Sequence, residues 1–313
     1  MKIVVVGAGI AGLAAAWELM REGRGHDITI LEGERRPGGV IVSEHVNGFV
    51  VEGGPDGFLA GETELPALAD ELNIGAHLID QEERGTSLWS DGELQPIDAG
   101  RAAVLLGIEA NAPAVAAGFR SFAQGMAEPV VALARALSGS LRLAQGVAGV
   151  AREGKRWRLA VTGGSAHEAD AIVLAVPAYT AGRLLESVGV TGARELAEVV
   201  YAPSITVSLA YRSEQIGRSL SGSGFIVEAP SPEQIRACTY ASQKFPGRAP
   251  PGHALLRAFL GPTDQHPAKL AREQLATILA IRGEPLWSRV FYWTRGLPRY
   301  RPQHREHVAG VRR

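Results

Sequence analysis

The first 32 residues set out a strand, a glycine-rich turn, a helix and a second strand, and this order limits the fold more than any other part of the chain. Residues 2–6 are apolar and β-branched, which predicts a strand buried on both faces. A Gly-x-Gly-x-x-Gly turn follows, residues 13–22 predict a helix, and residues 27–31 predict a second strand ending at Glu32. This pattern is typical of the first βαβ unit of an α/β fold with a parallel sheet.

The residue types in the turn suit a dinucleotide. Gly7 permits the tight turn, Gly9 lets the backbone approach a pyrophosphate, and Gly12 lets the helix pack on the strand. The helix N-terminus offers free N–H groups to phosphates. Glu32 lies about 20 residues beyond Gly12, where it can bind ribose hydroxyls and would repel a 2′-phosphate, which disfavours NADP. An ordinary glycine turn is the alternative interpretation. The predicted cofactor-binding residues here are Gly7, Ala8, Gly9, Ile10, Ala11, Gly12 and Glu32.

Two more glycine pairs follow within the next 25 residues or so. The first lies in Arg36-Pro37-Gly38-Gly39-Val40, and the second lies in Glu52-Gly53-Gly54-Pro55-Asp56, after an apolar stretch that predicts a strand. Each alone would be a surface turn more often than not. Because both pairs follow a dinucleotide fingerprint, a cofactor contact is the stronger interpretation: glycine backbone has no side chain and can lie flat against a planar ring. The further predicted cofactor-binding residues are Arg36, Gly38, Gly39, Val40, Gly53, Gly54, Pro55 and Asp56.

The three motifs, in this order, resemble the flavin amine oxidase superfamily, and residues 49–58 resemble the flavin-contacting segment of its protoporphyrinogen and coproporphyrinogen oxidases. The resemblance implies an α/β fold, α+β overall, with a Rossmann-like FAD-binding domain and a mixed-sheet substrate domain. It implies FAD bound without a covalent link, a porphyrinogen as substrate and molecular oxygen as acceptor, in heme synthesis. The flavin carries the chemistry in such enzymes, so no catalytic side chain is assigned.

Later motifs extend the resemblance to most of the chain. Residues 118–126 resemble the family's Phe-x-x-x-Gly-Met entry into a helix, and residues 293–300 resemble its tryptophan–proline–tyrosine motif near the flavin, which implicates Trp293. In the family, the residue at the position of Val147 contacts the adenine of FAD through its backbone. A buried core strand is the alternative interpretation of Val147. Residues 88–94 predict a hairpin with an Asp-Gly turn.

The chain also departs from the family. The family carries a long helical insertion that forms part of the substrate pocket and the membrane-facing surface, whereas residues 97–117 are a short connector. The family's glycine-rich segment covering the flavin would begin after Arg313. Both departures predict slow or absent porphyrinogen turnover. The family's hairpin arginine, which can pair with a substrate propionate, is replaced by Thr86, and Arg84 is the nearest candidate for that contact.

The predicted domain organisation follows the resemblance. Residues 1–96 form the first part of the FAD-binding domain, 97–117 the short connector and 118–185 the second part of that domain. Residues 186–290 form the substrate-domain sheet, and residues 291–313 return towards the FAD-binding domain.

Composition narrows the classes of partner. The chain has 313 residues and a formal net charge of −1, so no broad basic field is available to meet nucleic acid. A single cysteine, Cys238, excludes an internal disulfide and a Cys-cluster metal site, fits a reducing cytoplasmic compartment and is most simply a small core residue. The arginine-rich residues 299–313 predict either a solvated end or peripheral contact with acidic lipid.

Three interpretations of function stay open. The first is a porphyrinogen oxidase, acting on protoporphyrinogen or coproporphyrinogen. The second is a flavin-binding remnant of that family without catalytic activity, which the short connector favours. The third is a flavin oxidase of another substrate, such as an amine or a polyene. No pattern in the sequence fixes the oligomeric state.

Overall fold

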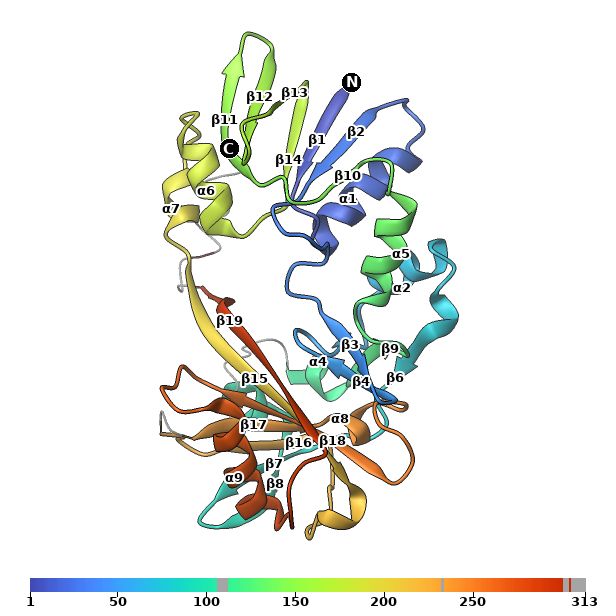
Figure 1. The fold of residues 1–313 in the computed structure, drawn as a ribbon, viewed down its shortest axis with the longest axis vertical. Helices are drawn as coiled ribbons and strands as arrows, with labels where there is room; N and C mark the ends of the chain where they lie inside the picture. Colours follow the sequence, from blue (N-terminus) through green and yellow to red (C-terminus); the bar gives the residue numbers. More distant parts are fainter. Residues whose placement is uncertain (106–111, 232–233, 301–303, 305–313) are drawn as a thin grey trace. The chain divides into compact units, whose positions relative to one another are not determined.

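The computed structural model describes residues 1–105, 112–231, 234–300 and 304 (Figure 1). The chain forms two compact units, each assembled from separated segments. Unit 1 comprises residues 1–41, 127–202 and 298–313, and unit 2 comprises residues 42–126 and 203–297. Among the described residues, no helix combines the length and the apolar character that a membrane span requires.

Unit 1 is built on a parallel sheet, as the βαβ pattern predicted. Its strand order is β10 (Leu141–Arg142), β2 (Asp27–Leu31), β1 (Lys2–Val6) and β14 (Ala171–Leu174). β1 pairs in parallel with both β2 and β14, so a β-branched strand lies inside the sheet. Val4 and Val6 of β1 pack with Leu31 of β2 in a buried cluster.

Helices and a second sheet complete unit 1. Helix α1 (Ile10–Arg21) packs against β1, β2 and helix α5 (Glu128–Ala136), and Figure 1 shows the two helices side by side. α1 starts three residues earlier than predicted, because its first turn forms directly on the glycine turn, where the Leu13 N–H donates to the Gly9 carbonyl at 3.0 Å. The remaining elements are β11 (Val147–Glu153), β12 (Arg156–Val161), β13 (Ala166–Ala169), α6 (Ala178–Glu186) and α7 (Ala193–Ala197).

Unit 2 is built on a mixed sheet. Its strand order is β19 (Trp287–Arg299), β15 (Val200–Arg212), β18 (His253–Leu260), β17 (Ile235–Tyr240), β16 (Gly224–Val227), β7 (Thr86–Ser90) and β8 (Glu93–Ile97). β16 pairs in parallel with β7, whereas β15, β17 and β18 pair in antiparallel fashion. Helix α9 (Pro267–Leu279) packs its apolar side chains into the core on this sheet, where Cys238 is buried as the sequence predicted.

Smaller elements surround the mixed sheet. β3 (Ser43–Val46) and β4 (Phe49–Glu52) form an antiparallel pair. The strands of a further small sheet are, in order, β5 (Phe58–Leu59), β9 (Phe119–Phe122) and β6 (Leu78–Asp80). The helical segments are α2 (Glu64–Glu71), η1 (Gly75–His77), α3 (Ala99–Leu105), α4 (Ala112–Ala116), η2 (Ser213–Gln215) and α8 (Ala241–Lys244).

The division into units differs from the predicted domain boundaries. The sequence placed residues 1–96 and 118–185 in one domain, but the chain leaves unit 1 after Ile41 and returns at Ala127. The reason is strand pairing: β7 joins β16, and β9 joins β5 and β6, all within unit 2. The predicted connector 97–117 holds α3 and α4, and its residues 106–111 lie outside the described residues. Strand β17 ends at Tyr240, and helix α8 begins at the next residue, Ala241.

Candidate functional site

The glycine turn of unit 1 has the tight packing that the fingerprint requires. Gly7 has a φ of 102°, and a Cβ placed there would collide with the Ala175 carbonyl after β14. A Cβ at Gly12 would collide with the Gly7 carbonyl. A Cβ at Gly9, in contrast, would find no atom within 4 Å. Gly7 and Gly12 are therefore needed by the fold, while the open space at Gly9 is what a closely approaching ligand needs.

Glu32 is tied directly to this turn. One carboxylate oxygen accepts a hydrogen bond from the Ala8 N–H at 2.7 Å, and the other accepts one from the Glu34 N–H at 2.9 Å. β2 thus delivers the carboxylate to the carboxyl end of the parallel sheet, beside the N-terminus of α1. Ala8 is buried, Ile10 is half-buried, and Ala11, in the first turn of α1, is exposed.

The second glycine pair lies against the first turn. The Gly38 N–H donates to the Ala8 carbonyl at 2.8 Å, and a Cβ at Gly39 would lie 3.9 Å from Gly9 Cα. Both glycines have positive φ, 102° and 58°. The Arg36 guanidinium donates to the Gly39 carbonyl at 2.6 Å and so fixes the loop, while Val40 is exposed. Gly39 of the second motif therefore lies beside Gly9 of the first, where no atom fills the position of a Cβ.

Val147 occupies a position that agrees with both of its interpretations. Its side chain is buried in the core of unit 1, as a core strand predicts. The backbone just before Val147 lies beside the segment after β2, because the Gln145 N–H donates to the Glu32 carbonyl at 2.7 Å. The contact of its backbone with an adenine stays a prediction.

The third glycine motif lies in unit 2, directly after β4. Within the described residues, the Gly53 carbonyl accepts hydrogen bonds from Thr206 Oγ1 at 3.3 Å, Arg257 Nη2 at 3.3 Å and Trp293 Nε1 at 2.8 Å. A Cβ at Gly53 would lie 2.6 Å from the ring of Phe291. Gly53 is therefore required by packing within unit 2. Its neighbour Gly54 is half-buried, and Pro55 is exposed.

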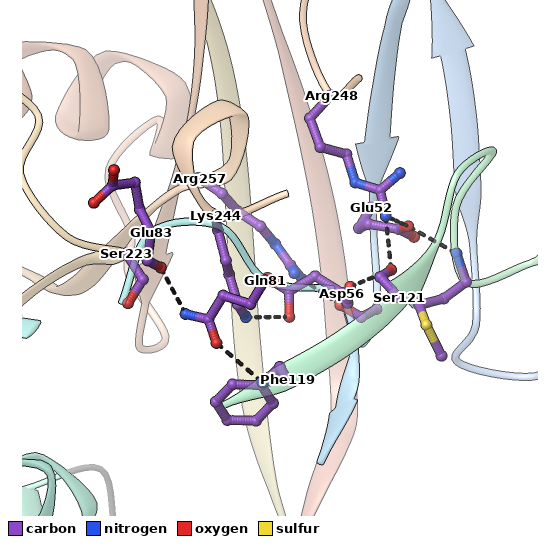
Figure 2. Close-up of polar contacts among 12 residues, drawn as sticks. Glu52, Asp56, Gln81, Glu83, Phe119, Ser121, Ser223, Lys244, Arg248 and Arg257 are labelled. Atoms are coloured by element: carbon purple, nitrogen blue, oxygen red, sulfur yellow. Dashed lines mark hydrogen bonds and ion pairs between the residues drawn. The ribbon is translucent and has the colours of Figure 1, made fainter. Parts of the chain in front are cut away.

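Asp56 forms a buried ion pair with a residue far away in the sequence. Lys244 Nζ lies 3.0 Å from both carboxylate oxygens of Asp56, and the Lys244 side chain is only 10% exposed (Figure 2). Burial raises the pKa of the Asp56 carboxyl, but the Lys244 and Arg257 charges outweigh it and leave that pKa below its ordinary value. Lys244 Nζ also lies 4.6 Å from the centroid of the Phe119 ring.

A second buried charge pair adjoins the first. Arg248 Nη2 lies 3.6 Å from a Glu52 carboxylate oxygen and donates to Ser121 Oγ at 2.7 Å (Figure 2). Glu52 also accepts hydrogen bonds from Ser43 Oγ at 2.7 Å and the Met126 N–H at 2.8 Å. Burial raises the pKa of the Glu52 carboxyl above its ordinary value, although these partners act in the opposite direction.

Sequence reasoning missed Lys244, Arg248 and Arg257. Arg257 carries a signal that could have been used, because it interrupts an apolar strand and is only 5% exposed. Arg84 is exposed in the loop before β7, beside Gly118 and Gly222. The loop that contains Arg84 is hydrogen-bonded to α8: the Glu82 N–H donates to the Lys244 carbonyl at 3.0 Å.

The comparisons with known proteins identify the family. The family model of flavin containing amine oxidoreductases matches residues 10–124 and 114–310. The chain belongs to this family. Its match divides near residues 114–124, next to the predicted short connector.

Curated relatives extend over nearly the whole chain. A coproporphyrinogen III oxidase of Bacillus subtilis (strain 168) is 20% identical over 427 aligned residues, covering 99% of this chain and 90% of the relative. One of Mycobacterium bovis is 26% identical and covers 98% and 89%, respectively. The alignment with the Bacillus protein is longer than the 313 residues of this chain, so that relative has residues without a counterpart here.

Solved structures share the fold. The crystal structure of an Exiguobacterium sp. 255-15 protein, provisionally named a protoporphyrinogen oxidase, superposes with a TM-score of 0.84 at 23% identity, covering 100% of this chain and 90% of the other. A reduced UDP-galactopyranose mutase superposes with a TM-score of 0.77 at 16% identity, covering 99% and 86%. The fold is the mixed α/β, Rossmann-like fold expected from the sequence.

The cofactor is FAD, and the residues present in unit 1 fit it. The open surface at Gly9 and Gly39 leaves room for a pyrophosphate, and the Glu32 carboxylate at the end of β2 is an acceptor for ribose hydroxyls. When bound, FAD supplies the acceptor for the electrons of a two-electron oxidation. These residues of unit 1 are the ones that would hold the cofactor.

Proposed function

We propose that this chain is an FAD-dependent oxidase of a porphyrinogen, with molecular oxygen as the final electron acceptor, in heme synthesis. The observation that carries the proposal is the match of coproporphyrinogen III oxidases with 98–99% of the chain. The site supports the proposal, because its residues would bind a flavin that itself takes the electrons.

Arg84 is the proposed contact for a substrate carboxylate. Arg84 is exposed in the loop before β7, whose backbone is hydrogen-bonded to α8, and a porphyrinogen of this class carries propionate side chains. An arginine is well suited to pair with a carboxylate in a bidentate geometry. We expect Arg84→Gln to raise the KM for the porphyrinogen about tenfold with little change in kcat, while Arg101→Gln, at another exposed arginine of unit 2, leaves both unchanged.

An oxidase of an amine is the second candidate. The family's description and the putrescine oxidase bound to putrescine, which shares this fold with a TM-score of 0.71, favour it. A flavin-binding protein without catalytic activity is the third candidate, favoured by the division of the family match beside the short connector.

Anaerobic reduction of the bound flavin separates the three candidates. Protein reconstituted with excess FAD is mixed without oxygen with coproporphyrinogen III, protoporphyrinogen IX or putrescine, and flavin absorbance is followed. Bleaching by a porphyrinogen, reversed by oxygen, is the expected result. Bleaching by putrescine alone, or by none of the three while FAD stays bound, would contradict the proposal. We expect slow turnover, because the connector lacks the family's insertion, and a rate of about 1 s⁻¹ or more would make that insertion dispensable.

A further inference from the structure

The Gly53–Gly54 peptide is held from one side by neighbouring strands of the unit 2 sheet. Its carbonyl oxygen accepts hydrogen bonds from Thr206 of β15, Arg257 of β18 and Trp293 of β19. These strands are neighbours in the order β19-β15-β18. The carbonyl therefore points at the sheet.

The orientation of this carbonyl fixes the N–H group of the same peptide. All described peptide bonds are trans, and in a trans peptide the C=O and N–H bonds point in opposite directions. The Gly54 N–H consequently points away from the sheet. Among the described residues it has no hydrogen-bond partner, although Gly54 is half-buried. The next residue, Pro55, has no N–H at all.

Arg257 contacts two carbonyls of this segment. Its guanidinium is buried and donates to the carbonyl of Gly54 as well as to that of Gly53. One guanidinium nitrogen, Nη2, thus holds two consecutive carbonyls. Phe291 limits Gly53 from β19, because its ring leaves no space for a side chain there.

We propose that Arg257 is a positioning residue: with Trp293 and Thr206 it holds the Gly53–Gly54 peptide so that the Gly54 N–H donates a hydrogen bond to the isoalloxazine ring of FAD. The proposal rests on FAD and on residues 53–56 as its flavin contact, and it does not depend on the porphyrinogen. Arg257 acts through the peptide and itself carries out no step of the reaction.

Hydrogen–deuterium exchange followed by mass spectrometry tests this proposal on the full chain. The readout is a peptide covering β4 and residues 53–56, with and without FAD, and with ADP as the ligand that lacks the flavin. In the wild type we expect FAD, but not ADP, to slow amide exchange in this peptide by about tenfold, as one added hydrogen bond allows. Arg257→Met should lose most of this protection and shift the visible spectrum of the bound flavin. Arg257→Lys should recover part of it.

Two further variants keep the result interpretable. Arg236→Met removes an exposed arginine of the adjacent strand β17 and should behave as the wild type. Trp293→Phe removes one N–H donor while keeping an aromatic ring. It therefore tests the role of the hydrogen bonds to the Gly53 carbonyl if Arg257→Met fails to fold. Full protection by FAD in both Arg257→Met and Trp293→Phe would overturn the proposal. Binding of FAD to the wild type without any protection of this peptide would also overturn it, while leaving porphyrinogen oxidation to be judged by flavin bleaching.

Discussion

Asp56 stays charged in a partly buried position because Lys244 Nζ lies 3.0 Å from both of its carboxylate oxygens. Taking either charge out of water alone is unfavourable, so each side chain requires the other. The pair joins the segment after β4 to helix α8. A change at either residue should therefore affect the predicted flavin contact as well as stability.

Replacing Asp56 by Asn should leave the Lys244 ammonium buried without a counter-charge. We expect a loss of about 3 kcal/mol in the free energy of unfolding at pH 7. The folded-state pKa of Asp56 is lowered, so its contribution is present above the ordinary carboxyl pKa and is lost as pH falls through the folded value. Urea unfolding of wild type and variant at several pH values should thus give a difference that shrinks below about pH 4.

The matched control is Asp80→Asn. Asp80 pairs with Arg120, but its side chain is 78% exposed, so its loss should cost less than about 1 kcal/mol. A difference between wild type and Asp56→Asn that stayed constant from pH 7 to pH 3 would contradict the charge argument.

Replacing Glu32 by Ala should weaken FAD binding by roughly 1.5–3 kcal/mol, because the variant loses a charged acceptor for two ribose hydroxyls. The carboxylate also accepts a hydrogen bond from the Ala8 N–H, so the variant loses this bond to the glycine turn. The dissociation constant is measured by quenching of flavin fluorescence. Glu34→Ala, at an exposed position two residues on, is the control. An unchanged dissociation constant in Glu32→Ala would place the ribose elsewhere.

Among the elements, the β7–β8 hairpin depends most visibly on its turn. Asp91 and Gly92 connect the strands, and both have positive φ, 51° and 82°. This is the conformation of a type I′ turn, for which Asp-Gly is a preferred pair. The register set by this turn buries Leu88 against Ile226 of β16.

Gly92→Ala should lower the free energy of unfolding by about 1–2 kcal/mol, since an L side chain resists the left-handed conformation. Urea unfolding measures the change. Gly149→Ala, in β11, serves as the control because its φ is not positive and a Cβ there meets no atom within 4 Å. Equal stability of Gly92→Ala and the wild type would mean that the turn relaxes without cost.

At the scale of the whole molecule, each unit has its own core, and the chain passes between the units after residues 41, 126, 202 and 297. The dinucleotide fingerprint and Glu32 belong to unit 1, and the Gly53–Asp56 segment and Trp293 belong to unit 2.

FAD should raise the melting temperature of the chain, whereas NADP should not, because Glu32 would repel the 2′-phosphate. At a free concentration of 100 times its dissociation constant, FAD should add about 2.7 kcal/mol to stability. Differential scanning calorimetry with each nucleotide makes the comparison. A larger rise with NADP than with FAD would contradict the assignment of the cofactor.

Local patterns in the sequence predicted the parallel strands of unit 1 and the packing at Gly7 and Gly12, because those features depend on neighbouring residues. The ion pair of Asp56 and Lys244 could not be predicted in this way, since its partners are 188 residues apart. The division of the chain after Ile41 was not predicted for the same reason. Strand β7, which contains Leu88, belongs to unit 2 because it pairs with β16, far along the chain. The contacts of site residues with FAD stay predictions.

The parallel pairing of β7 with β16 has a consequence for biosynthesis. Leu88 leaves the ribosome long before Ile226, its partner in the register, and at about 5–20 residues per second the delay is roughly ten seconds. During that time the apolar face of the β7–β8 hairpin has no sheet to join. A nascent chain with such a long-range pairing folds slowly and exposes an unpaired strand edge meanwhile. Slower elongation or limited chaperone capacity in an expression host should therefore lower the yield of soluble protein.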